Sequence, residues 1–193
     1  MSRIIPLFSS PIYMNQVVLD EQELESIEQE ECLVNVHTQS PNNGLMSVDM
    51  FILNKYPKLK DVCINHTESF IFDELKYKRD INYRISLSWL NIHPPNHSSH
   101  KHCHSNSKFS GVLYLNFPKD SGDIMFEIPS AYRTIEPEVS EWNVYNSTSW
   151  KIQPHKGLCI LFPSHLEHYT GVNTTEQNRY SLAFDVVVSV MNE

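Results

Sequence analysis

The chain is organised around residues 102–115, HCHSNSKFSGVLYL, where two histidines stand two apart directly before a strongly β-forming run. In an extended backbone, successive side chains alternate between two faces, so His102 and His104 project together and Cys103 turns aside. Two neutral imidazoles on one face offer half of a site for a divalent transition metal such as Fe, Zn, Cu or Ni. The stretch therefore predicts a metal site whose remaining ligand lies elsewhere in the chain.

A second group of histidines follows an apolar run near the end of the chain. Residues 157–163, GLCILFP, end at a proline, and His165 and His168 come soon after it. A side chain just past such a strand lies at a sheet edge or barrel mouth, where sites on β-barrels open. Either histidine can supply the missing ligand on this argument.

An arginine opens the last apolar strand of the sequence. Arg179, Ser181 and Ala183 share one face of that strand. An unpaired buried charge is costly, so this arginine needs an anionic partner, and its planar guanidinium matches a carboxylate in bidentate geometry. The partner is either a bound carboxylate or a structural one, such as Asp185 or a glutamate on a helix.

Hydrophobic periodicity divides the chain into helices followed by strands. Apolar residues at helical spacing predict helices over residues 20–31 and 57–75, and His66 on the second apolar stripe reads as a core or boundary residue. We expect Trp89 and Trp150 in the core, although either could border a pocket. Alternating or short apolar runs predict strands over residues 81–89, 109–117, 123–128, 149–152, 157–162 and 179–190. This order favours helices packed on a β-sandwich or barrel.

Size and composition fit one soluble domain. The chain has 193 residues, of which 40% are hydrophobic and 20% charged. A formal net charge of −8 argues against a non-specific nucleic-acid binder. We expect a cytoplasmic protein with no membrane association, because the start lacks an apolar signal region and no run has the length of a membrane span. Four widely spaced cysteines form no CxxC pair and read as reduced, mostly buried thiols.

Taken in order, the His-x-His, the β-hairpin region, the distal histidine and the following arginine resemble the 2-oxoglutarate/Fe(II)-dependent oxygenases. More narrowly, the chain resembles a family described as "Putative 2OG-Fe(II) oxygenase", which is common in marine bacteria and their phages. The matching blocks are LFSSP at residues 7–11, the stretch at 102–115, and GLCILFPSHLEH at 157–168 followed by Arg-x-Ser at 179–181. The resemblance covers nearly the whole chain.

The resemblance implies a fold that is mainly β with flanking helices, a double-stranded β-helix or jelly roll of the cupin-like kind. It implies a single oxygenase domain over residues 1–193, with an extended segment and helices in 1–80 and the jelly-roll core in 81–190. The implied cofactors are Fe(II) and 2-oxoglutarate, with O2 as co-substrate. The reaction would be hydroxylation coupled to decarboxylation of 2-oxoglutarate to succinate and CO2, with a protein side chain or small molecule favoured over a nucleic acid as substrate.

The resemblance also assigns roles to single residues. It implies that His102, His104 and His168 bind iron and that Arg179 grips the outer carboxylate of 2-oxoglutarate. Tyr114 resembles a tyrosine that also touches the co-substrate in prolyl-hydroxylase-like relatives, and Ser181 would be its weaker companion.

One position departs from the superfamily pattern. His104 stands where a carboxylate is more usual, and exchanging a carboxylate for an imidazole removes one negative charge from the metal. Two alternatives therefore stay open: a three-histidine cupin-type dioxygenase that needs no 2-oxoglutarate, and a zinc-binding or non-catalytic jelly roll. Residues 100–102 form a second His-x-His, but the spacing to Ser110 and Gly111 favours His102 and His104.

Overall fold

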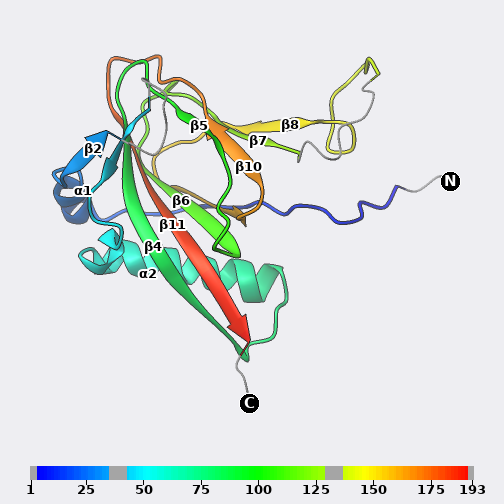
Figure 1. The fold of residues 1–193 in the computed structure, drawn as a ribbon, viewed down its shortest axis with the longest axis horizontal. Helices are drawn as coiled ribbons and strands as arrows, with labels where there is room; N and C mark the ends of the chain where they lie inside the picture. Colours follow the sequence, from blue (N-terminus) through cyan, green and yellow to red (C-terminus); the bar gives the residue numbers. More distant parts are fainter. Residues whose placement is uncertain (1–3, 35–42, 129–136, 191–193) are drawn as a thin grey trace.

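The computed structural model describes residues 4–34, 43–128 and 137–190. Within these residues two antiparallel sheets pack against each other (Figure 1). The large sheet has the strand order β1-β9-β6-β11-β4-β3-β2, and the small sheet has the order β5-β10-β7-β8. The mainly β jelly-roll fold with flanking helices is confirmed.

Most strands match the predicted runs, and the additional strands lie in the N-terminal part of the chain and at the histidines. The strands are β1 (Tyr13–Gln16), β2 (Cys32–Val34), β3 (Leu45–Ser47), β4 (Ile81–His93), β5 (Ser99–His102), β6 (Phe109–Asn116), β7 (Ile124–Glu127), β8 (Ser149–Ile152), β9 (Leu158–Pro163), β10 (Glu167–Thr170) and β11 (Arg179–Val190). The sequence analysis missed β5 and β10, whose residues lack an apolar alternation.

The helices precede the core strands, as predicted. They are α1 (Glu21–Ile27), a 3-10 turn η1 (Ile52–Asn54), α2 (Pro57–Glu68) and a π-helical turn η2 (Ser69–Glu74) that continues α2. The expectation of a helix to residue 31 is wrong, because α1 ends at Ile27, the last buried residue of its apolar face. No helix among the described residues has the length and apolar character needed to span a membrane.

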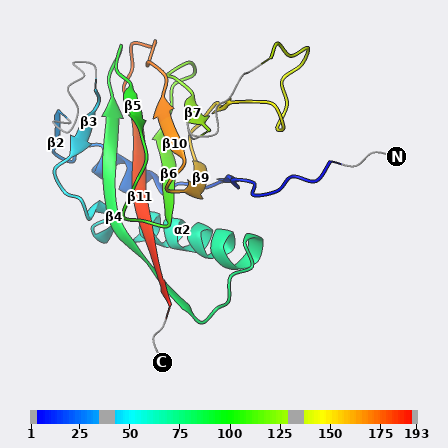
Figure 2. The ribbon, with the colours of Figure 1, turned by 45° about the vertical axis from the view of Figure 1, so that its right-hand side comes forward.

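Hydrophobic cores form on both faces of the large sheet. Strand β9 shows the alternation: Cys159 and Leu161 pack in the core that includes α2, whereas Ile160 and Phe162 pack in a core shared with the small sheet. Figure 2 shows α2 crossing behind β4 and β11. The helices therefore cover one face of the large sheet and the small sheet covers the other, which leaves the end of the inter-sheet space open for a site.

Candidate metal centre

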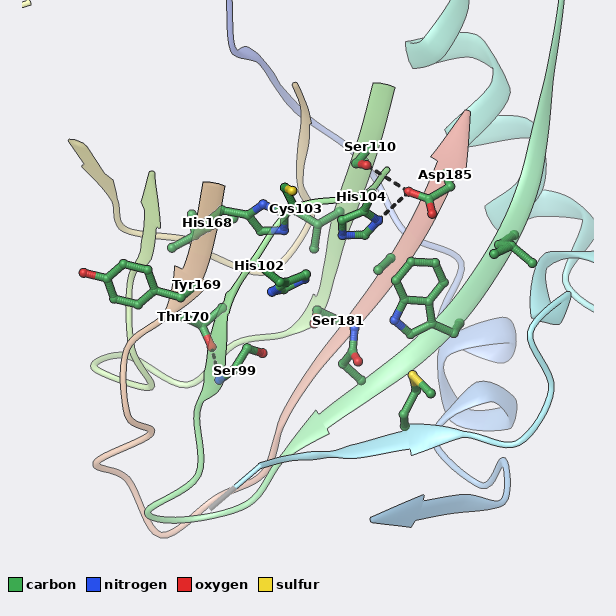
Figure 3. A pocket seen from close by; sticks show the side chains of 18 of the residues that line it. Ser99, His102, Cys103, His104, Ser110, His168, Tyr169, Thr170, Ser181 and Asp185 are labelled. Atoms are coloured by element: carbon green, nitrogen blue, oxygen red, sulfur yellow. Dashed lines mark hydrogen bonds and ion pairs between the residues drawn. The ribbon is translucent and has the colours of Figure 1, made fainter. Parts of the chain in front are cut away.

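Three histidines from two stretches of chain meet between the sheets. His102 ends β5, His104 lies two residues further, and His168 sits on β10 directly opposite His102 in the strand register. Their potential ligand atoms all lie within 4.8 Å of one another, and Figure 3 shows the three rings gathered. This spacing is compatible with three ligands around one metal ion.

Each imidazole of the cluster is oriented by a hydrogen bond from Nδ1. His102 donates to the backbone carbonyl of His100 (2.8 Å), His168 to that of Leu166 (2.9 Å), and His104 to Oδ1 of Asp185 (2.7 Å). These oxygens accept and do not donate, so the hydrogen stays on Nδ1 of each ring. The Nε2 lone pairs are left for a metal, which is the usual arrangement of metal-binding histidines.

Burial keeps the deeper rings of the cluster uncharged. It lowers the pKa of His168 to about 3, with a smaller contribution from His102. Burial also lowers the pKa of His102. Because only the neutral imidazole binds a metal, the rings of His168 and His102 are in the metal-binding protonation state at neutral pH.

A cavity of about 410 Å³ opens beside the three histidines. Its walls come from both sheets. Besides the histidines they include Tyr114, Ser181, Ala183 and Asp185 from the large sheet and Thr170 from the small one. The predicted shared face of β11 therefore continues to Asp185, which the sequence analysis named only as a possible partner of Arg179 and not as a residue of the histidine site.

Arg179 lies buried behind this cavity and does not line it. Its Nη2 donates to Thr170 Oγ1 (2.9 Å), and its Nη1 donates to the backbone carbonyls of Ser121 and Gly122. Only 1% of its surface is exposed, and burial lowers its pKa to about 10. None of the described carboxylates lies within ion-pair distance of it, so the alternative of a structural partner such as Asp185 is wrong for this part of the chain.

The inner end of the site holds polar atoms without partners. Arg179 Nε, Ser121 Oγ and His93 Nδ1 are buried and make no hydrogen bond with any residue that the structure describes. His93 stands opposite Arg179 in the register of β4 and β11, and burial, followed by the charge of Arg179, holds its pKa well below the ordinary value. A buried cation with an unused N–H and no described anion fits a bound carboxylate.

The other candidate co-substrate residues, Tyr114 and Ser181, face each other across β6 and β11 and both line the cavity. Tyr114 is 2% exposed, and burial raises the pKa of its hydroxyl. The structure thus brings these two residues together with the histidines, and their role toward a ligand stays a prediction.

Several candidate residues do not join the three-histidine cluster. His165 is exposed, and His100 is exposed at the cavity wall with its ring centroid 4.9 Å from that of His102. Cys103 is also exposed and contributes to the cavity lining, although its thiol is outside the cluster. His66 is a boundary residue, as expected, and its Nδ1 lies 2.7 Å from the hydroxyl of Tyr13.

The expectation that both tryptophans lie in the core is wrong. Trp89 lines the cavity beside His104, and Trp150 is 46% exposed at a second hollow near the edge of the small sheet. Trp89 is on β4 and stays half-buried, because it borders the open cavity.

Residues 87–185 match the family model described as "Putative 2OG-Fe(II) oxygenase". None of the curated proteins matches the sequence.

Solved structures resemble this fold at low sequence identity. An oxidoreductase of the 2OG-Fe(II) oxygenase family from Burkholderia pseudomallei is 15% identical, with a TM-score of 0.62 over 91% of this chain and 84% of the other. HygX from Streptomyces hygroscopicus, with nickel and 2-oxoglutarate bound, is 12% identical, with a TM-score of 0.63 over 92% and 83%. A prolyl-4-hydroxylase from Pseudomonas putida is 14% identical, with a TM-score of 0.58 over 93% of each chain. These likenesses establish the fold.

Proposed function

The chain belongs to the "Putative 2OG-Fe(II) oxygenase" family, and from this premise we propose that His102, His104 and His168 hold its Fe(II). Membership makes the protein an oxidoreductase whose cofactors are Fe(II) and 2-oxoglutarate. When bound, the pair activates O2 for hydroxylation of a substrate, and 2-oxoglutarate leaves as succinate and CO2. The single observation that carries the ligand assignment is the gathering of three imidazoles whose potential ligand atoms lie within 4.8 Å of one another, each with its Nδ1 engaged in a hydrogen bond.

The proposal for the co-substrate rests on the buried arginine. Arg179 carries a charge with no described carboxylate near it, an unpaired Nε, and a hydrogen bond to Thr170 at the cavity wall. Its guanidinium would take the outer carboxylate of 2-oxoglutarate, while Tyr114 and Ser181 would bound the space between arginine and metal. HygX, which shares the fold, has been solved with nickel and 2-oxoglutarate bound.

We propose a protein side chain or a small molecule as the substrate. The large sheet contributes the apolar side chains Trp89, Leu87 and Met46 to the cavity wall, and Trp89 lies against His104. Such a wall favours a neutral or apolar group beside the metal over a nucleic-acid backbone. Among proteins of this fold are a prolyl-4-hydroxylase and HygX, the latter also solved with hygromycin B bound.

The test is release of succinate from 2-oxoglutarate by anaerobically purified, Fe(II)-loaded protein, without any added primary substrate. His168→Ala and Arg179→Ala are compared with His165→Ala, a matched control that removes an exposed histidine from the turn just before β10. We expect iron-dependent succinate from the wild type and the control and none from the other two variants. Binding of Fe(II) and 2-oxoglutarate is followed in parallel by calorimetry and by the visible absorption of their complex.

Each alternative reading has its own outcome. Metal-dependent O2 consumption that survives in Arg179→Ala without succinate would favour a three-histidine dioxygenase that needs no 2-oxoglutarate. Tight binding of zinc, with neither Fe(II) nor 2-oxoglutarate bound, would favour a structural jelly roll and overturn the proposed function.

A further inference from the structure

Asp185 accepts a hydrogen bond from one of the three clustered histidines. Its Oδ1 accepts the Nδ1 hydrogen of His104 at 2.7 Å and the hydroxyl hydrogen of Ser110 at 2.8 Å (Figure 3). The side chains of His104 and Asp185 are only 13% and 11% exposed. The carboxylate is therefore poorly screened by water and acts on the imidazole at short range.

The fold fixes the position of this carboxylate. Strand β11 pairs with β4 on one side of Asp185, and directly after it the partner residue jumps from Leu87 to Ile85, which leaves Ser86 of β4 as the extra residue of a bulge. On its other side Asp185 stands directly opposite Ser110 of β6. Because the extra residue is on β4, Asp185 keeps the face of β11 that it shares with Ser181 and Ala183, and all three line the cavity.

A chain of hydroxyls extends the contact and holds the loop that carries His104. Ser110 Oγ lies 2.8 Å from Ser164 Oγ, which accepts from Ser107 (3.0 Å), and the backbone N–H of His104 donates to the carbonyl of Ser164 (2.9 Å). Asp185 is thus held by Ser110 of β6, and His104, which it faces, is anchored by its backbone to Ser164.

The charge of the site explains why such a contact matters. Non-haem iron in oxygenases is usually held by two histidines and one carboxylate, which leaves the ion with one compensating negative charge. Three neutral imidazoles supply none. A carboxylate that accepts the Nδ1 hydrogen of a ligand histidine makes Nε2 a stronger electron-pair donor to the metal. It also brings a negative charge close to the metal without being a ligand itself.

We propose that His104 and Asp185 together replace the carboxylate ligand, with His104 supplying the ligand atom and Asp185 the negative charge. The inference rests on the proposed function, because it takes His104 as a ligand. Asp185 is a positioning and charge-compensating residue and touches neither co-substrate nor metal itself. The pair thereby accounts for a histidine at a position where the superfamily pattern has an acid.

The first test exchanges the charge and keeps the shape. Asp185→Asn retains an oxygen that can accept from His104, so a purely structural role predicts little change in the metal site. We expect the Kd for Fe(II), measured anaerobically by calorimetry, to rise about 10- to 100-fold. The Fe(III)/Fe(II) potential of the loaded protein should also rise, because removal of a negative charge destabilises Fe(III) more than Fe(II). Ser110→Ala, which removes a hydrogen bond to the same oxygen but no charge, is the matched control and should change both quantities less.

The second test moves the carboxylate. In His104→Asp the new carboxylate and Asp185 face each other, and like charges at short range oppose a site in which both are ionised. We expect weak Fe(II) binding in His104→Asp and recovery of at least about tenfold in the double variant His104→Asp/Asp185→Asn. Urea unfolding of the metal-free variants shows whether each is folded.

The outcomes separate this inference from the proposed function. Wild-type Fe(II) affinity in Asp185→Asn, or a double variant no better than His104→Asp, would overturn the charge-compensating role. His168→Ala that binds Fe(II) as tightly as the wild type would instead overturn the ligand assignment itself.

Discussion

The indole of Trp89 stacks on the imidazole of His104, with ring centroids 5.7 Å apart and planes inclined by 23°. Trp89 comes from the centre of β4, so the large sheet contributes an aromatic surface to the cavity next to the proposed ligand. This contact places a fluorescent side chain beside the site and gives it an intrinsic reporter.

Binding of a paramagnetic ion should quench Trp89. The chain has three tryptophans, and the other two, Trp142 and Trp150, are 61% and 46% exposed. Titration of the metal-free protein with Ni²⁺ or Co²⁺ should lower the emission, and Trp89→Phe should remove most of that change while the Kd measured by calorimetry stays the same. Trp150→Phe is the control and should leave the quenching intact; equal quenching in Trp89→Phe would place the ion elsewhere.

Replacing Arg179 should weaken 2-oxoglutarate binding through its outer carboxylate. Arg179→Met keeps an unbranched apolar stem but removes the guanidinium and its charge, and a lost charged hydrogen bond of about 1.5–3 kcal/mol corresponds to a Kd increased about 10- to 150-fold. The Kd of Arg179→Lys for 2-oxoglutarate should lie between those of the wild type and Arg179→Met, because lysine retains the charge but lacks the planar fork of N–H donors. Calorimetry on the Fe(II)-loaded proteins measures the effect.

A ligand that lacks the outer carboxylate provides the control for Arg179. 2-Oxopentanoate has a methyl group in place of that carboxylate, so wild type and Arg179→Met should bind it with similar, low affinity. If Arg179→Met weakened both acids equally, the arginine would act on the site through packing rather than through the carboxylate.

Gly111 is required by the packing beneath the cavity floor. A Cβ added at this position would stand 2.2 Å from Cζ of Phe184, which is fully buried on the adjacent strand. Gly111→Ala should lower the free energy of unfolding by about 1–3 kcal/mol, the usual effect of overpacking. Urea unfolding checks this, and Gly171→Ala, where the nearest atom would be 3.3 Å away, should cost less.

A double variant identifies Phe184 as the neighbour responsible. The free energy of unfolding lost in Gly111→Ala/Phe184→Leu should be smaller than the sum lost in the two single variants, since the smaller leucine leaves space for the new methyl group. Strictly additive losses would show that the clash is relieved elsewhere.

His66 should make stability fall in mild acid. Burial lowers its pKa below the ordinary 6.5, so between its folded pKa and about 6.5 the unfolded chain binds more protons than the folded one. The contribution of His66 is complete above about pH 6.5 and is lost as the pH falls through its folded pKa. His66→Gln, which can still accept from Tyr13, should therefore lose less unfolding free energy than the wild type between about pH 7.5 and about pH 5.

The comparison for His66 is made on metal-free protein, so that the clustered histidines contribute equally to both curves. Curves of unfolding free energy against pH that run parallel in wild type and His66→Gln would contradict the prediction.

The sequence by itself determined the parts of the fold whose pattern is local. Alternation along residues 81–89 and 179–190 predicts strands because one side of each must be buried, and these residues lie in β4 and β11 of the large sheet. The same alternation predicts that His102 and His104 project together. Their role as ligands, with His168, stays a prediction that the structure makes geometrically reasonable.

Only the tertiary structure decided the features that depend on pairing between distant segments. The short strands β5 and β10 carry polar residues without alternation. They form because β5 pairs with β10 and β10 also pairs with β7, and that register sets His168 against His102 and leaves His165 in solvent. The partners of Asp185 and Arg179 follow from the same cause. The partner of a buried charged group is the group that the packed strands bring close to it. That distance in space cannot be read from the separation of the two residues along the chain.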